Sequence, residues 1–440
     1  MNQWKISGRW VAAAGAAWVF GAAAQPLPKA SPESVGMSSE RLGKLTAMLQ
    51  QEVADKRLPG AVVMVARKGK LVYAQAVGGL NSANGGKDGG AMKEDSIFRI
   101  YSMTKPLVST ALMMLVEEGR VQLADPVSKF LPSFKAPMVS ASTLDPVSGA
   151  VSNRLVAANR EPTIYDLLRH TSGVAYGELT RNPLVREAYV KAGVYKPTLD
   201  FDAREQPGPQ MAEALGKAPL AQQPGTTWEY SLSVDVQGRV IEAVTGKRLG
   251  DFLQERLFGP LKMTDSGFMV AEAKLGRVAE PFAKDPATGV DNKLIDISKS
   301  PGNDSGGAGG VSTAGDYLRY CQAMLGGGQL DGTRILSRTT VRHMTSDHLA
   351  GINTTSNPGM LLLGSPGYSF GLGFLVRPAD GNAAVQGSAG EFMWAGYAGT
   401  FFWAEPKEQV CTVYMTQAPS PLRAGYRRLM KELVSQAIVD

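Results

Sequence analysis

Cysteine and histidine are scarce in this sequence. Its 440 residues hold two cysteines and three histidines. These residues form neither an H-E-x-x-H pattern nor a Cys/His cluster, which excludes the common zinc motifs. Phosphate-binding loops and dinucleotide fingerprints are missing too. The sequence therefore predicts neither a metal site nor a cofactor.

An excess of charge of one sign is also missing. The formal charge is +6 at pH 7, and basic residues are spread along the chain rather than gathered in a block. Nucleic acid is therefore not an expected partner. Beyond the first 24 residues, each hydrophobic segment is interrupted by charges, glycine or proline, too early for a membrane span. We expect the mature chain not to insert into a membrane.

The one long apolar run lies at the N-terminus, over residues 10–24. It follows Lys5 and Arg9 and ends in three alanines, an order typical of a secretory signal peptide. A membrane anchor is the alternative, but the run is short for a span of about 20 residues. The sequence predicts cleavage after Ala24 and export to the periplasm or beyond. Loss of the two basic residues would leave a charge of 6 − 2 = +4.

Both cysteines lie in apolar surroundings, Cys321 in DYLRYCQAML and Cys411 in QVCTVYMT. Two cysteines are few for an exported protein. The sequence favours two separate buried thiols, with a disulfide as the open alternative.

Sheet-forming segments are expected near both ends of the chain, with helices between them. Runs rich in β-branched residues predict a hairpin and three later strands, at 61–65, 71–77, 370–376, 397–405 and 409–416. Apolar residues at helical spacing predict helices at 38–55, 102–119, 163–170, 237–245, 315–324 and 422–438. This order favours a two-part α/β architecture with a helical insertion.

A short motif at the start of one predicted helix carries reactive groups. Ser102 and Lys105 form an S-x-x-K sequence, and residues three apart share a helix face, so the amine can reach the hydroxyl. Free N–H groups at a helix start favour the anion formed when a serine attacks. Chance alone supplies about one such match in a chain of this length. The motif therefore needs further support.

A serine activated by histidine is the main alternative. No serine has glycine at both −2 and +2, so the usual nucleophile elbow is missing. His170, His343 and His348 lie near helix ends and are interpreted as structural. The base must then be sought among lysines and tyrosines.

Several longer motifs occur in order along the chain. They resemble the serine β-lactamase and penicillin-binding-protein superfamily, specifically the class C β-lactamase-like branch that contains the family VIII carboxylesterases. The likeness rests on PESVGMSSERL, PGAVVMVARKGKLVY, FRIYSMTKP, TIYDLLRHTSG, PGTTWEYSLSVDVQG, GGAGGVSTAGDYLRYCQAML and EFMWAGYAGTFFW. It implies an α+β fold: an antiparallel sheet flanked by helices (27–98 and 262–440), a mainly helical inserted domain (99–261), and an active site between them.

The resemblance also implies roles for particular residues. Ser102 matches the family's nucleophile, Lys105 its partner and Tyr230 the catalytic tyrosine. A neighbouring ammonium would favour the Tyr230 phenolate, so lysine and tyrosine would share the proton transfers. The third family motif is matched by the Trp-Ala-Gly sequence that ends at Gly396, where glycine lets the strand approach the substrate. The N–H groups of Ser102 and Tyr397 would then form an oxyanion hole.

Two departures from the β-lactamase pattern bear on the substrate. Leu232 replaces an asparagine, so it cannot hydrogen-bond a lactam amide. Trp394 replaces a lysine, which removes a charge-assisted contact of about 1.5–3 kcal/mol with a β-lactam carboxylate. The resemblance therefore implies a carboxylesterase that hydrolyses short- to medium-chain esters through an acyl-enzyme on Ser102, without a cofactor. Its partner would be a small-molecule ester, bound with the help of Leu232, Trp394 and Gly396.

Other activities stay open at this point. A β-lactamase or D-amino-acid peptidase would use the same residues, and a non-catalytic β-lactam-binding receptor would keep the fold. A receptor has no need of a complete Ser-Lys-Tyr set, which speaks against it. Two long connections, 136–161 and 351–368, are either surface loops or parts of the substrate entrance.

Overall fold

The computed structural model describes residues 26–440 except 82–88, 145, 147, 149–150 and 198–203. The predicted signal peptide, with its cleavage site after Ala24, lies outside the described residues. Within the described part, no helix combines the length and apolar character needed to cross a membrane.

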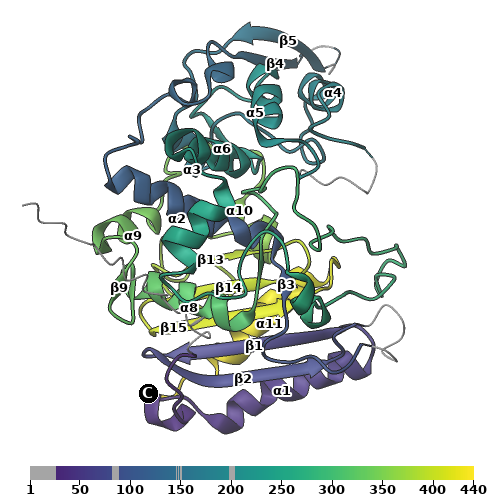
Figure 1. Cartoon of the computed structure of the whole chain (residues 1–440), viewed down its shortest axis with the longest axis vertical. Coiled ribbons are helices and arrows are strands. Elements are labelled where there is room, and N and C mark those ends of the chain that lie inside the picture. The colour runs from purple at the N-terminus through teal and green to yellow at the C-terminus, as the bar shows by residue number, and fades with distance from the viewer. Residues whose placement is uncertain (1–25, 82–88, 145, 147, 149–150, 198–203) are drawn as a thin grey trace, which may run out of the picture.

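A seven-stranded antiparallel sheet joins the two ends of the chain (Figure 1). Its strand order is β11-β12-β13-β14-β15-β1-β2. In the register of β1 with β15, Ala61 lies opposite Thr416, so the first and last strands of the sequence are neighbours. The strands are β1 Gly60–Arg67, β2 Lys70–Gly78, β11 Ser369–Phe370, β12 Leu375–Val376, β13 Phe392–Ala395, β14 Phe401–Glu405 and β15 Val410–Thr416.

Helices cover both faces of this sheet. On β14, the Phe402 ring lies 4.9 Å from Tyr317 of α8 (Ala314–Leu325). The next residue, Trp403, faces the other way, and the Lys431 amine of α11 (Arg423–Ser435) lies 5.3 Å from its ring. Because neighbouring strand residues point to opposite faces, α8 and α11 cover opposite sides. Helix α1 (Ser39–Ala54) packs on β2 and α11, with Ser38 as its N-cap.

A mainly helical part lies above the sheet in Figure 1. Its centre is α2 (Thr104–Glu117), an almost fully buried helix against which α6 (Ser233–Thr245) packs. Pro106 lies in the first turn of α2, where a missing N–H costs little. Around this pair lie α3 Ile164–Leu168, α4 Pro183–Lys191, α5 Gly208–Lys217 and α7 Leu249–Leu253, with the hairpin of β4 Met138–Leu144 and β5 Val151–Ala157.

Short elements connect these parts. They are β3 Phe98–Arg99, β6 Thr227–Trp228, β7 Val311–Ser312, β8 Gln329–Leu330, β9 Thr333–Arg334, β10 Asn353–Thr354, α9 Arg338–Met344 and α10 Pro358–Leu363. The expected α+β class, with an antiparallel sheet and flanking helices, is confirmed. The exact division into 27–98 with 262–440 and 99–261 stays a prediction.

Two predicted strands differ from the structure. The run 370–376 contains two short strands, β11 and β12, separated by a turn. The run 397–405 becomes a strand only at Phe401, because the chain turns back at Gly396 and at Gly399, whose φ is +99°. The strand before this turn, β13, was not predicted, although it carries Trp394.

Cys321 on α8 and Cys411 on β15 are buried and free, as the sequence favoured. They are nevertheless neighbours across the interface between helix and sheet. Burial, with the Cys411 thiol beside it, raises the pKa of Cys321 well above its usual value. The Cys321 thiol is therefore not a reactive thiolate.

Candidate active site

Ser102 lies in a tight turn between β3 and α2. The turn, Tyr101–Met103, is a 3-10 helix, so the nucleophile candidate lies two residues before the start of the α-helix rather than at its first residue. Tyr101 has a φ of +43°, which is rare for an aromatic residue and costs backbone energy. Its hydroxyl accepts a hydrogen bond from the backbone N–H of Ile295 at 3.1 Å, which helps to hold the turn. Ser102 remains half-buried and faces a cavity.

The Lys105 amine contacts the Ser102 hydroxyl, as the S-x-x-K spacing predicts. Its Nζ donates to Ser102 Oγ at 3.1 Å, to the Tyr176 hydroxyl at 2.9 Å and to the Gly307 carbonyl at 2.7 Å. The side chain is almost wholly buried. Burial lowers the pKa of Lys105 to about 7, although the charge of Asp235 acts in the opposite direction. Near neutral pH, a large share of the molecules therefore carries a neutral amine that can accept a proton.

Tyr230 reaches the same serine from the loop before α6. Its hydroxyl donates to Ser102 Oγ at 2.7 Å, and the Lys105 amine lies 4.6 Å from its ring centre. Burial raises the pKa of Tyr230, which outweighs the hydrogen bond with Ser102. The expectation that a neighbouring ammonium favours the phenolate is therefore wrong: Tyr230 is a protonated donor. The structure does bring Ser102, Lys105 and Tyr230 together.

A chain of buried hydroxyls supports the Tyr230 loop from behind. His170 Nδ1 lies 2.9 Å from Ser231 Oγ, Ser231 Oγ lies 2.7 Å from Ser233 Oγ, and the latter lies 2.8 Å from Ser172 Oγ. The imidazole also packs against the Tyr230 ring, at 5.1 Å between centres. Burial, then the nearby Lys105 charge, lowers the pKa of His170 well below its usual value. His170 is therefore neutral and does not contact Ser102.

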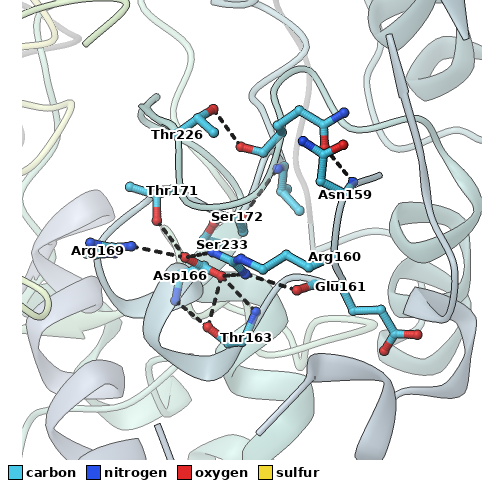
Figure 2. Close-up of polar contacts among 12 residues, drawn as sticks. Asn159, Arg160, Glu161, Thr163, Asp166, Arg169, Thr171, Ser172, Thr226 and Ser233 are labelled. Atoms are coloured by element: carbon cyan, nitrogen blue, oxygen red, sulfur yellow. Dashed lines mark hydrogen bonds and ion pairs between the residues drawn. The ribbon is translucent and has the colours of Figure 1, made fainter. Parts of the chain in front are cut away.

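The polar cluster in Figure 2 continues this support into α3. At its centre is Asp166, which accepts hydrogen bonds from the N–H of Thr163 at 2.9 Å and the Thr171 hydroxyl at 3.0 Å. Arg160 and Arg169 donate to the same carboxylate at 3.0 and 3.3 Å. Burial alone would raise the pKa of Asp166, but these donors, Arg160 foremost, hold it below the usual value. Asp166 thus stays charged and fixes the segment that leads to His170 and Ser172.

The loop after β13 lies directly against the turn that carries Ser102. Gly396 donates its N–H to the Thr400 carbonyl at 2.8 Å. A Cβ atom at Gly396 would lie 2.4 Å from the Ile100 carbonyl oxygen and 2.2 Å from Thr400 Oγ1, so only glycine fits. Tyr397 follows with its side chain half exposed, 5.4 Å from the Tyr101 ring. This close approach places the Gly396–Tyr397 peptide beside the serine turn.

The three substrate-contact candidates line a cavity of about 820 Å³ that opens at Ser102. Trp394 is buried beneath it, with its ring 5.5 Å from Tyr230, and Leu232 is likewise buried. Of the two long connections, 351–368 contributes Leu361 and Leu362 through α10. The described residues of 136–161 form mainly the β4–β5 hairpin and do not line the cavity. Further apolar lining comes from Tyr101, Leu179, Leu294 and Ile295.

Several polar residues that line the site were missed in the sequence, among them Tyr176, Asp235 and Glu178. The Tyr176 hydroxyl accepts a hydrogen bond from Lys105. Asp235 accepts from the Gly307 N–H at 3.1 Å, and the carbonyl of Gly307 accepts from Lys105. Glu178 lines the cavity, and its charge acts on the Lys105 pKa. The only signal was position: Tyr176 follows the His-Thr-Ser-Gly motif closely, and Asp235 comes five residues after Tyr230.

No group of side chains in the described part of the chain is arranged to hold a metal ion. The absence of a metal or cofactor nevertheless stays a prediction. Chemically, the site combines a hydroxyl, a neutral amine beside it and a protonated phenol, which is the arrangement of an activated serine nucleophile.

Comparisons with known proteins agree with this geometry. A family model described as Beta-lactamase matches residues 45–435. The chain belongs to the beta-lactamase family. Among curated relatives, Esterase EstB of Burkholderia gladioli is 30% identical over 81% of this chain and 85% of its own length. Monacolin J acid methylbutanoyltransferase of Aspergillus terreus is 26% identical over 84% of this chain and 88% of its own.

Among solved structures, this beta-lactamase-family chain resembles EstCE1, described as a hydrolase with promiscuous acyltransferase activity. The TM-score is 0.71 at 24% identity, over 90% of this chain and 98% of the other. The family predicted from the sequence motifs is confirmed. So is the enzyme class, a serine-type carboxylic ester hydrolase.

Proposed function

We propose that this beta-lactamase-family member hydrolyses short- to medium-chain carboxylic esters through an acyl-enzyme on Ser102. The observation that carries the proposal is the pair of contacts on Ser102 Oγ: the Lys105 amine at 3.1 Å and the Tyr230 hydroxyl at 2.7 Å. With a Lys105 pKa of about 7, the amine serves as the base, and the protonated phenol serves as the acid.

Acylation follows from these contacts. Neutral Lys105 takes the proton of Ser102, and Oγ attacks the ester carbonyl. The N–H groups of Ser102 and Tyr397 stabilise the oxyanion, a contribution of about 3 kcal/mol per donor in comparable sites. When the tetrahedral intermediate collapses, the bond to the alcohol breaks and Tyr230 gives its proton to the leaving oxygen.

The proton returns to Tyr230 through a third residue. Tyr176 accepts from the Lys105 amine at 2.9 Å and is hydrogen-bonded to Tyr230 as well. The Lys105 ammonium therefore passes its proton through Tyr176 to Tyr230, which restores the neutral amine. In deacylation, Lys105 takes a proton from the attacking water. The bond between the acyl carbon and Ser102 Oγ then breaks, Tyr230 gives its proton to Oγ, and the carboxylic acid is released.

Two residues that line the cavity support uncharged esters as substrates. Leu232 and Trp394 are buried apolar residues at positions where a β-lactamase pattern has an amide and a cation. A β-lactam carboxylate would lose a charge-assisted contact there. The name of the relative Esterase EstB supports the same substrate class.

Acyl transfer to an alcohol is the second candidate. A cavity of about 820 Å³ lies near the upper end of the range for small-molecule sites and exceeds what a short acyl ester fills. An alcohol seated in the remaining space would take the place of water in deacylation. The transferase among the relatives supports this outcome.

The decisive experiment compares wild type with Ser102→Ala on p-nitrophenyl acetate, butyrate and octanoate, and on nitrocefin. A matched control is Ser109→Ala on α2, because the Ser109 hydroxyl donates to Gln237 and not to a residue of the site. Ester hydrolysis should vanish only in Ser102→Ala. Undiminished hydrolysis in that variant would exclude the mechanism. Preference for nitrocefin would exclude the esterase, and a higher product yield on adding n-butanol would favour transfer.

We also propose that the mature protein is exported and begins at Gln25. The charged start, apolar run and small residues of the N-terminus support this. Fractionation of expressing cells and N-terminal sequencing of the extracytoplasmic protein test it. An intact Met1 on cytoplasmic protein would contradict it.

A further inference from the structure

Arg427 is a buried cation outside the Ser-Lys-Tyr set. It lies on α11, and 3% of the residue is exposed. Its Nη2 donates to the Gly396 carbonyl at 2.7 Å, and its Nη1 donates to the Leu362 carbonyl of α10 at 3.0 Å. Burying a guanidinium is costly unless its contacts repay the lost hydration. The two carbonyl contacts of Arg427 therefore need to account for the cost of burying its charge.

The carbonyl that Arg427 holds belongs to the peptide whose N–H is the proposed oxyanion donor. This peptide joins Gly396 to Tyr397, and the described residues contain no cis peptide bond. In a trans peptide the C=O and N–H groups point in opposite directions. Arg427 thus binds the carbonyl side of the peptide, and the Tyr397 N–H points away from the guanidinium.

We propose that Arg427 is a positioning residue for the oxyanion hole: its guanidinium holds the Gly396–Tyr397 peptide in place and strengthens the Tyr397 N–H as a donor. This inference rests on the proposed function. The side-chain hydrogen bonds of Arg427 go to the Gly396 and Leu362 carbonyls and not to Ser102, Lys105 or Tyr230.

The physical basis is polarisation together with rigidity. A cation at a carbonyl oxygen draws electron density through the amide, so its N–H becomes a better donor, as in cooperative hydrogen-bond chains. Donors that are already oriented stabilise an oxyanion without reorganising during the reaction. Burial and the neighbouring Arg423 lower the pKa of Arg427 to about 9, so it still carries its charge at neutral pH. The Gly399 N–H also donates to Gly396, at 3.2 Å, but it carries no net charge.

The second hydrogen bond of Arg427 connects the oxyanion hole to the substrate cavity. Leu362, whose carbonyl it holds, is buried on α10 and lines the cavity with Leu361. One side chain thus holds both the Gly396–Tyr397 peptide and a wall of the substrate cavity. Arg428, the next residue, is half-buried, and among the described residues its side chain donates to the Leu363 carbonyl of α10. It provides a matched control that contacts α10 but not the oxyanion peptide.

The test compares Arg427→Lys and Arg427→Ala with Arg428→Ala. For p-nitrophenyl butyrate we expect kcat to fall 10- to 100-fold in the Arg427 variants, with KM changed less than threefold. Affinity for an alkylboronic acid, which forms a tetrahedral anion on Ser102, should fall by a similar factor. Arg428→Ala should keep both values within twofold of wild type. If Arg427 only stabilised the fold, its substitution would lower activity by lowering the fraction of folded enzyme. Active-site titration measures this fraction, so kcat is calculated per folded active site.

Chemical rescue gives a second readout. Ethylguanidinium added to Arg427→Ala should raise kcat at least fivefold, because the vacated side chain borders the cavity. It should not affect Arg428→Ala. If Arg427→Ala does not fold, the kcat and boronate values of Arg427→Lys decide the question.

Two results would overturn the inference: unchanged kcat in the folded Arg427 variants, or a loss of kcat with unchanged boronate affinity. Ser102→Ala separates this failure from failure of the proposed function. If that variant is inactive while the Arg427 variants keep their kcat, only the positioning role falls. If Ser102→Ala remains active, both proposals fall.

Discussion

Two buried charged side chains, Asp166 and Lys105, are held in opposite ways. Asp166 has two arginines, a backbone N–H and a hydroxyl directly on its carboxylate, and its pKa stays below the usual value. Lys105 donates to two hydroxyls and a carbonyl, while Asp235 and Glu178 act on it only through space. Its pKa falls to about 7.

The difference between Asp166 and Lys105 shows that a buried ionisable group can serve either the fold or the reaction, depending on its direct partners. A buried charge with direct partners keeps its charge and fixes the backbone around it. A buried charge without a direct opposite charge becomes titratable near neutral pH, which suits a general base. The two residues are linked in space, because the segment that Asp166 fixes ends at His170, which packs on Tyr230.

The largest expected effect comes from Lys105→Met. Ester hydrolysis should fall at least about a thousandfold, because the base is lost. Stability at pH 7 should rise by about 0.5–2 kcal/mol, as when a strained functional group is removed. In wild type the unfolded chain binds more protons than the folded one between about pH 7 and 10, so stability rises with pH there. Urea unfolding at several pH values would show whether this slope disappears in the variant.

Asp166→Ala should mainly affect stability. Loss of the carboxylate leaves Arg169, the Thr163 N–H and the Thr171 hydroxyl without their acceptor, and should cost about 3 kcal/mol. The pKa of Asp166 is lowered, so its stabilisation is present near neutral pH and is lost as the pH falls below the usual carboxyl range. Thermal unfolding at pH 7 and at about pH 2 measures both effects. Glu213→Ala, which removes an exposed ion pair with Lys217, is the control and should leave Tm unchanged.

The pH dependence of wild type follows from Lys105. Below a pKa of about 7, kcat/KM for p-nitrophenyl butyrate should fall about tenfold per pH unit, because only the neutral amine takes the serine proton. Above it, the rate should level off, since Tyr230 with its raised pKa remains protonated. A second bend between pH 7 and 9 would contradict the assignment of Tyr230 as a proton donor.

Ser231→Ala should give the smallest change. The hydroxyl links His170 to Ser233 behind the Tyr230 loop, and its loss should cost about 1 kcal/mol of stability. We expect kcat to fall less than tenfold. A loss as large as that of Lys105→Met would mean that the support behind Tyr230 takes part in proton transfer.

Local and distant parts of the site differed in how well sequence could predict them. Ser102 and Lys105 are only three residues apart, so the S-x-x-K spacing predicts that the amine can reach the hydroxyl. Tyr230 and Tyr397 come from distant segments, and only the family motifs connected them with the serine. Tyr176 and Asp235 were missed because hydrogen bonds between segments far apart in the sequence leave no periodic signal. The direction of the Tyr230 pKa was missed as well, because burial depends on packing across the whole cavity.

The most direct test of the account is an NMR titration of the Lys105 amine, with protein labelled in lysine and Lys105→Met used to assign the signal. The account predicts a Lys105 midpoint near pH 7, while exposed lysines titrate near 10.4. A Lys105 amine that stays charged up to pH 9 would contradict its role as the base that activates Ser102.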